Sequence, residues 1–202
     1  MPRSSKSPTG YNRDARWQRE RQAAAFGKWA ERFAASGYTA DFLTFKFDPL
    51  SGPAAAVHAA MLREVERVYA TFVTHVVRNP AALSSCGRLP VWISSPDYPV
   101  FKVKRERLVD LAINDGAHVH AITFTPPASR LQGESLVDHF ARRNAVYIRV
   151  GVSLREIYVE PITHDLAGVV AYALKALTSG RIDEDESLIL PRTLHELAQG
   201  TS

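Results

Sequence analysis

The spacing of apolar residues along the chain predicts several helices. An irregular apolar stripe runs from residue 14 to 35, and a second stripe, which repeats every three or four positions, runs from about residue 53 to 78. Residues 135–143 show a shorter helical pattern, and residues 165–178 a further one with Asp165 as its N-terminal cap. The long second helix should bury one continuous face made of Val57, Met61, Val65, Val68, Phe72 and Val76.

Short runs rich in β-branched and aromatic residues predict strands between these helices. The Asp115-Gly116 turn joins two of the runs and predicts a β-hairpin there. Strands gathered in the middle of the chain, with helices before and after, indicate the α+β class, with a central antiparallel sheet covered by helices on one face. The predicted strands are residues 42–47, 91–93, 100–103, 108–113, 118–125, 146–150 and 156–160.

Composition places the chain among soluble globular proteins. Its 202 residues suffice for a domain with a proper core, and the single cysteine, Cys86, excludes an internal disulfide and a zinc site built from cysteines. The sequence shows no secretion signal and no apolar run of bilayer length. We therefore expect a cytoplasmic protein without a membrane partner.

The net charge of +4 is concentrated near the N-terminus. Residues 1–37 hold eight Lys and Arg against three Asp and Glu, and the rest of the chain is close to neutral. We divide the chain accordingly into a basic N-terminal arm and helix, residues 1–37, and a second domain, residues 38–202. Such an arm suits the phosphate backbone of nucleic acid, or it is a solvated surface that keeps the protein soluble.

Two histidines on one predicted strand are the most informative feature of the sequence. Because side chains alternate between the faces of a strand, His118 and His120 project to the same side. Two neighbouring imidazoles are half of a divalent-metal site, although ordinary core or surface histidines are the simpler explanation of the pair taken alone. Since two imidazoles hold Mg²⁺ or Mn²⁺ poorly, an oxygen ligand is expected beside them.

Asp110 is the predicted third ligand. With a two-residue turn, Asp110 pairs with Ala121 and faces away from the histidines, whereas with a three-residue loop it lies opposite Ile122, on their face. The sequence leaves both registers open, as well as a plain ion pair between Asp110 and a nearby basic residue. His164 and Asp165 are weaker candidates for metal ligands.

A tyrosine and a lysine share one side of the last predicted helix. Tyr172 and Lys175 lie on its face of small residues, away from the leucines and valines that form the buried stripe. Alone, this pattern is better explained by a tyrosine packed at a helix rim. Combined with the histidine pair, it predicts a DNA-nicking site in which Tyr172 attacks a phosphodiester and Lys175 balances the growing negative charge.

Further basic residues are candidates for weak contacts with DNA. A run of four lies just before the predicted hairpin, where it would follow a DNA strand, although a solvated strand edge explains it as well. The candidates are Lys46, Lys102, Lys104, Arg105, Arg107, Arg16 and Arg19.

These motifs, in this order, resemble those of the HUH endonucleases, and among them the replication-initiator (Rep) proteins of rolling-circle plasmids and phages. Residues 42–48 resemble the first motif, a strand that opens the catalytic domain. Residues 110–126 resemble the second motif, with its acidic residue, turn and histidine pair, and residues 172–175 resemble the third, which carries the nucleophile. The resemblance covers roughly residues 40–180.

The resemblance implies an HUH fold, in which a central antiparallel sheet has an RRM-like topology. It implies that His118, His120 and Asp110 bind Mg²⁺ or Mn²⁺, that Tyr172 is the nucleophile and that Lys175 assists it. The implied reaction cleaves single-stranded or hairpin DNA and leaves a 5′-phosphotyrosine link and a free 3′-hydroxyl, as in the initiation of rolling-circle DNA replication.

Two departures from the family pattern refine this expectation. Ala176 and Ser179 stand where a two-tyrosine relative has its second tyrosine, so we expect a single-tyrosine mechanism. The sequence holds no Walker A motif, so no helicase is expected. The alternatives are a transposase-like or relaxase-like relative, a non-catalytic nucleic-acid-binding protein with an HUH-like fold, and a metal-dependent phosphoesterase of another fold that does not use Tyr172.

Overall fold

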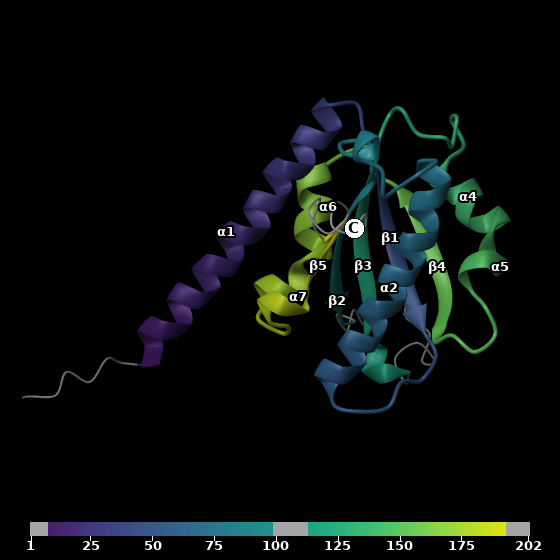
Figure 1. Ribbon diagram of the computed structural model, residues 1–202. Helices are drawn as coiled ribbons and strands as arrows, with labels where there is room; N and C mark the ends of the chain where they lie inside the picture. The colour runs from purple at the N-terminus through teal and green to yellow at the C-terminus, as the bar shows by residue number, and fades with distance from the viewer. Residues whose placement is uncertain (1–7, 99–112, 193–202) are drawn as a thin grey trace, which may run out of the picture.

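The fold is α+β, built on one five-stranded antiparallel sheet with the strand order β4-β1-β3-β2-β5 (Figure 1). We describe a computed structural model of the protein, which places residues 8–98 and 113–192. The predicted class and the antiparallel sheet are confirmed. The strands are β1 (Thr39–Phe47), β2 (Val91–Asp97), β3 (His118–Thr125), β4 (Leu154–Pro161) and β5 (Leu188–Leu190).

Helices precede, interrupt and follow the strands. The predicted helix at residues 135–143 is confirmed, with Ser135 accepting a hydrogen bond from Asp138 N as its cap, and Asp165 caps the later helix as predicted. The α-helices are α1 (Pro8–Ala35), α2 (Ala54–Val76), α4 (Leu136–Arg142), α5 (Asn144–Tyr147), α6 (Leu166–Ala173) and α7 (Lys175–Thr178). Short 3₁₀ turns are η1 (Leu83–Ser85), η2 (Asn114–Gly116) and η3 (Glu184–Glu186).

Helices cover both faces of the sheet, so the prediction of one covered face is wrong. Alternate residues of β1, such as Phe45, face the core that α2, α4 and α5 close, and α2 contributes the whole predicted stripe to it. The intervening residues, such as Phe42, face a second core that α1 and α6 close, with Ile122 and Phe124 of β3 (Figure 1).

The N-terminal helix is part of the folded body. It begins at Pro8, earlier than predicted, and Ala30 is fully buried against α6 and the sheet. Phe33 stacks on Phe124 of β3, with ring centroids 4.9 Å apart, and also contacts Trp29 and Tyr38. The basic segment therefore carries an apolar face that helps to hold α6 in place.

The predicted hairpin before the histidine strand is wrong. Both neighbours of β3 are other strands, since Ile122 pairs with Phe42 of β1 on one side and with Ile93 of β2 on the other. Asp110 itself lies outside the described residues. The strand predicted at residues 146–150 is also wrong, because its first half is the helix α5, whose Tyr147 is fully buried.

None of the helices within the described residues is long and apolar enough to cross a lipid bilayer.

Replacing Phe33 by alanine tests whether α1 belongs to the folded body. The variant should lower the free energy of unfolding by about 2 kcal/mol, because it removes a partly buried phenyl ring that stacks on Phe124 of β3. Trp17→Ala is the matched control, since Trp17 is 56% exposed on the same helix and its loss should change stability by less than about 0.5 kcal/mol. Urea unfolding measures the stability of both variants. An equal loss in the two would contradict the packing of Phe33 against β3.

Candidate metal centre and nucleophile

The two predicted histidines lie side by side on the central strand. His118 and His120 point to the α6 face of β3, with their Nε2 atoms 3.0 Å apart. His120 is buried and His118 is partly exposed. The prediction that both imidazoles share one face is confirmed.

A third side chain joins the pair from the neighbouring strand. Asp97, the last residue of β2, is opposite His118 in the ladder, so its side chain lies on the same face. Its Oδ2 atom lies 3.2 Å from His120 Nε2 and 3.6 Å from His118 Nε2. Asp97 is absent from the predicted ligands because the predicted strand ends at residue 93, four residues before it.

Asp97, His118 and His120 have the geometry of a ligand set for a divalent cation, and each offers one atom within 4.8 Å of the others. Metal–ligand bonds of about 2.1 Å, at right angles, place neighbouring ligand atoms about 3 Å apart, close to the separations found here. One carboxylate and two imidazoles form a mixed oxygen and nitrogen set that suits Mn²⁺ better than imidazoles alone.

Hydrogen bonds orient both rings with Nε2 toward the cluster. His118 Nδ1 lies 2.9 Å from the carbonyl oxygen of Gly116, which can only accept, so Nδ1 carries the proton and Nε2 keeps its lone pair. His120 Nδ1 lies 3.1 Å from the hydroxyl of Thr44 on β1. Outer contacts of this kind fix the direction of metal-binding imidazoles.

Burial and charge prepare these groups to bind a cation. Burial, reinforced by the neighbouring His120, lowers the pKa of His118 to about 4, and burial also lowers the pKa of His120, so both rings are neutral at pH 7. Burial opposes the charge of Asp97, but the adjacent His120 and Lys175 hold the pKa of the carboxyl below its usual value. Neither carboxylate oxygen has a hydrogen-bond partner of good geometry among the described residues, and Oδ2 is held by the ion pair with Lys175.

The predicted nucleophile and its lysine lie directly over this cluster. The ring of Tyr172 lies 5.6 Å from that of His120, centroid to centroid, and Lys175 Nζ lies 4.1 Å from the Tyr172 ring centroid. Lys175 also forms an ion pair of 2.7 Å with Asp97 Oδ2. Burial opposes its charge, but Asp97 and the adjacent Tyr172 raise the pKa of Lys175 above its usual value.

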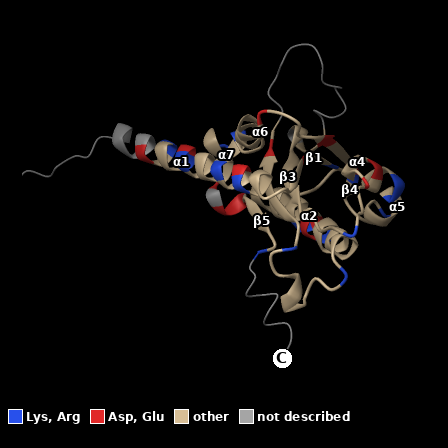
Figure 2. Ribbon diagram, turned by 90° about the horizontal axis from the view of Figure 1, so that it is seen from above, with Lys and Arg blue, Asp and Glu red and all other residues tan. Residues whose placement is uncertain are grey.

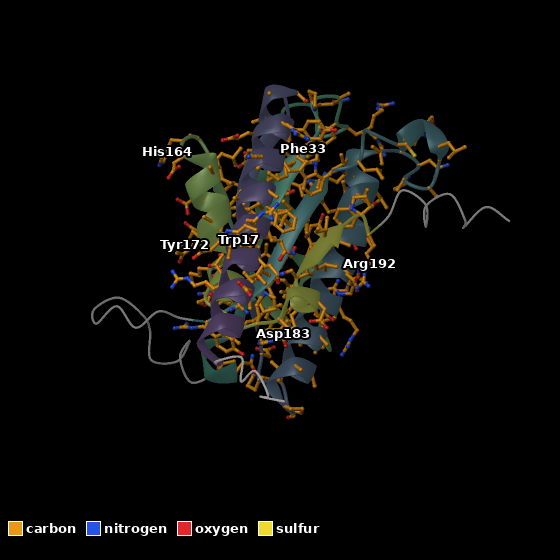
Figure 3. The ribbon with its side chains drawn as sticks, turned by 90° about the vertical axis from the view of Figure 1, so that its left-hand side faces the viewer. Trp17, Phe33, His164, Tyr172, Asp183 and Arg192 are labelled. Carbon is orange, nitrogen blue, oxygen red and sulfur yellow. The ribbon has the colours of Figure 1, made fainter. Side chains whose placement is uncertain are left out.

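A break in the last helix brings the lysine down to the sheet. The predicted single helix is divided at Leu174, whose backbone leaves the helical region, and α7 starts at Lys175. Tyr172, on α6, stays 51% exposed, and Figure 3 labels it on the outer side of the protein below His164. The Tyr172 side chain is thus open to a large substrate, whereas the three candidate ligands lie beneath it.

The start of α6 depends on a close contact between a cap and a glycine. Asp165, in the left-handed region with φ 45°, accepts a hydrogen bond of 3.1 Å from Gly168 N. A Cβ atom on Gly168 would lie 2.1 Å from Asp165 Oδ2, so only glycine fits beneath this cap. Asp165 therefore acts as a helix cap in the structure, as the sequence also suggested.

The remaining candidate residues lie apart from the cluster. His164 is exposed and lies within hydrogen-bond distance of Thr163, and Lys46 forms an ion pair of 3.5 Å with Glu156 of β4. Arg16 pairs with Glu20 on α1, and Arg19 packs against Gly180; Figure 2 shows the basic residues along this helix. Lys102, Lys104, Arg105, Arg107 and Asp110 lie outside the described residues.

Comparison with known proteins gives no match: no family model, no curated protein sequence and no solved structure is similar to this chain.

Asp97→Asn tests the ligand set. The variant keeps the shape of the side chain but removes its charge, so affinity for Mn²⁺ should fall at least about tenfold in isothermal titration calorimetry. His164→Gln is the control, because His164 is an exposed histidine outside the cluster, and its affinity should equal that of the wild type. Wild-type Mn²⁺ binding by Asp97→Asn would show that Asp97 is not a ligand.

Gly168→Ala tests the contact that starts α6. The added methyl group should displace the Asp165 cap and lower the free energy of unfolding by about 1–2 kcal/mol, measured by urea unfolding. Gly27→Ala should instead raise the free energy of unfolding by up to about 1 kcal/mol, because alanine favours the interior of a helix such as α1. The site has room for the methyl group, since the nearest atom, Ala167 Cβ, would lie 3.9 Å from it. A stable Gly168→Ala protein would contradict the close contact.

Proposed function

We propose that this protein is a metal-dependent endonuclease that nicks single-stranded or hairpin DNA through Tyr172 and forms a 5′-phosphotyrosine link. The observation that carries the proposal is the stack of a half-exposed tyrosine, a protonated lysine and a buried His-His-Asp cluster. A tyrosine that merely packs at the rim of a helix would not require a buried His-His-Asp cluster beneath it. The buried cluster beneath it, with a carboxylate oxygen left unpartnered among the described residues, is typical of a site that binds a cation.

The motif resemblance supports the finer part of the proposal. The histidine strand is central in an antiparallel sheet, and the helix with the tyrosine packs on the face to which both histidines point. This arrangement is the one expected for an HUH endonuclease with an RRM-like sheet. We extend the proposal to a role in rolling-circle replication initiation on the strength of the motifs alone.

Each residue has a role that follows from its contacts. A divalent cation held by Asp97, His118 and His120 would withdraw charge from the scissile phosphate. The Tyr172 hydroxyl gives its proton to water and its oxygen forms a bond to phosphorus, while the bond from phosphorus to the 3′-oxygen breaks and the leaving oxygen takes up a proton from water to become a hydroxyl. The Lys175 ammonium, beside the ring, would balance the negative charge that grows on the phosphate during the attack.

A covalent adduct is the decisive result. We expect the wild-type protein with Mn²⁺ and a pool of single-stranded and hairpin oligonucleotides to form a protein–DNA adduct, visible as a shifted band in a denaturing gel. Tyr172→Phe should abolish the adduct because it removes the attacking oxygen. Tyr158→Phe is the matched control, since Tyr158 is 55% exposed on β4 and lacks contacts with the cluster, so its adduct should remain.

The other outcomes separate the alternatives. An adduct that survives in Tyr172→Phe would assign the nucleophile to another residue. Cleavage without any adduct would indicate a metal-dependent phosphoesterase that uses the histidines alone. Salt-dependent DNA binding without Mn²⁺ binding or cleavage would indicate a nucleic-acid-binding protein without catalytic activity.

A further inference from the structure

A cavity of about 650 Å³ lies at the end of the sheet, where β1 begins and where β3 and β4 end. Its walls come from the end of α1, the segment between β3 and α4, and the segment between β4 and α6. Tyr38, Leu131, Leu136 and Ile162 supply apolar surface. A cavity of this volume, whose walls combine apolar surface with polar side chains, has the form of a small-ligand site, and the proposed chemistry does not use it.

One of the polar groups at this cavity is a carboxylate without a partner among the described residues. Asp41 lines it and is only 6% exposed, and no group within the described residues donates a hydrogen bond to it or forms an ion pair with it. Burial alone raises its pKa to about 6. Thr125 lines the same cavity, and its hydroxyl is also unpartnered among the described residues. Unpaired buried groups of this kind are costly unless a ligand satisfies them.

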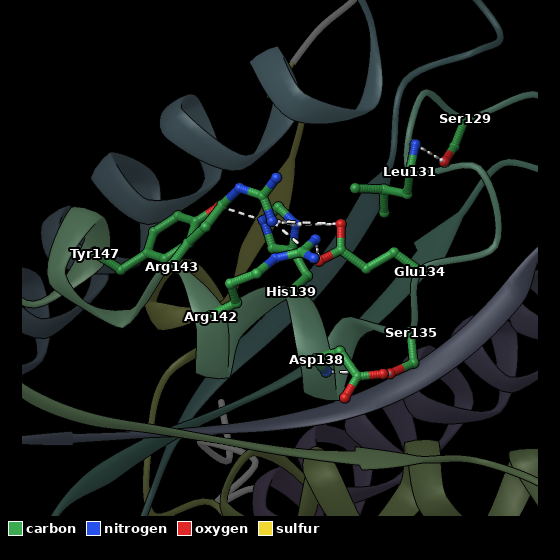
Figure 4. A network of polar contacts seen from close by, with 9 residues as sticks. All are labelled: Ser129, Leu131, Glu134, Ser135, Asp138, His139, Arg142, Arg143 and Tyr147. Carbon is green, nitrogen blue, oxygen red and sulfur yellow. Dashed lines mark hydrogen bonds and ion pairs between the residues drawn. The ribbon is translucent and has the colours of Figure 1, made fainter.

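A second carboxylate on the cavity wall is fully occupied. Glu134 binds Arg142 and lies 3.0 Å from Arg143 Nη1, and Figure 4 shows this network together with the Ser135 cap of α4. The two arginines hold the pKa of Glu134 below its usual value, although burial opposes its charge. The wall is therefore preformed, and Asp41 remains the acceptor that is open to a ligand.

A second cavity lies beside the first, next to the proposed nucleophile. A smaller cavity of about 340 Å³ runs from Phe42 and Tyr172 along α6, and residues 161–164 line both spaces. Figure 3 shows His164 and Tyr172 along the same outer side of this helix. Because Asp41 lies on the α2 face of β1, as Phe45 does, and Tyr172 lies on the α6 face, a chain that reaches both passes around the end of the sheet beside residues 161–164.

We infer that the cavity binds an unpaired guanine of the DNA strand whose phosphodiester lies at Tyr172, and that Asp41 is the residue that selects it. The inference rests on the proposed nicking of single-stranded DNA. The Watson–Crick edge of guanine offers two adjacent N–H donors, N1–H and the 2-amino group, which match the two oxygens of one carboxylate. Thr125, the diagonal neighbour of Asp41 across the β1–β3 pair, donates its hydroxyl to O6.

The other bases fit this acceptor less well. Adenine and cytosine each present one amino group beside a ring nitrogen that is itself an acceptor, and this nitrogen would face the second carboxylate oxygen. Thymine offers a single N–H between two carbonyl groups. A buried acceptor left unpaired by the wrong base is the usual source of strong discrimination. Unstacked bases of single strands are read in this way, on their Watson–Crick edges.

Selection from a random pool tests the inference independently of cleavage. Full-length Tyr172→Phe protein, with Mn²⁺ present, is used to retain oligonucleotides from a random single-stranded pool, and the retained sequences are read. We expect guanine to be enriched at one fixed position of the retained sequences. The same selection with Asp41→Asn in addition should lose that enrichment.

Base analogues identify the contact. Inosine lacks the 2-amino group, so inosine at the selected position should weaken binding about tenfold when Asp41 is present and should have no effect in Asp41→Asn. 7-Deazaguanine keeps the Watson–Crick edge and should bind as guanine does. If Asp41→Asn fails to fold, Thr125→Val serves instead, and it should weaken the preference for guanine while keeping the shape of the side chain.

The outcomes distinguish the two proposals. Retained DNA with no guanine preference, or an equal inosine penalty with and without Asp41, would overturn the guanine site even if the wild-type protein forms its adduct. A guanine preference that depends on Asp41, in a wild-type protein that forms no adduct, would support the site and overturn the nickase. Retention of no oligonucleotide at all would overturn the guanine site, whereas the nickase stands or falls with the wild-type adduct.

Discussion

The site depends on the burial of one carboxylate, that of Asp97. A charged group with no exposed surface is costly unless positive or hydrogen-bonding partners surround it, and the Lys175 ammonium, 2.7 Å from Oδ2, and His120, at 3.2 Å, meet that requirement. The same contacts connect β2 to β3 and to α7. The ion pair therefore holds α7 against the sheet.

The parts of the fold that follow a local repeat could be predicted from the sequence. The stripe of α2 repeats at helical spacing and is buried as expected, and β1 shows the alternation of a strand between two packed layers. The shared face of His118 and His120, and the proximity of Tyr172 to Lys175, follow from the periods of strand and helix. The role of Asp165 as the N-terminal cap of α6 could also be predicted from the neighbouring residues.

The parts that depend on distant pairing could not be predicted. Asp97 joins the histidines only because β2 pairs with β3 across a long intervening segment, and no local pattern marks that register. Pro96 predicts that the strand stops early. In the structure it lies beyond residues 92–94, the part of β2 that pairs with β5, and a proline is tolerated where one side of a strand has no partner. Residues 146–150 have the composition of a strand, but burial of Tyr147 beside His139 favours a helical turn.

The division of the last helix at Leu174 separates two tasks that are adjacent in the sequence. Lys175 is tied to the sheet through Asp97, whereas Tyr172 belongs to a short segment held by α1 and by the cap at Asp165. Different contacts therefore fix the positions of the two residues. Substitutions at the contact between α1 and α6 could shift the position of Tyr172 and leave the ion pair of Lys175 with Asp97 intact. The distance from the tyrosine to the cluster is thus open to engineering in this fold.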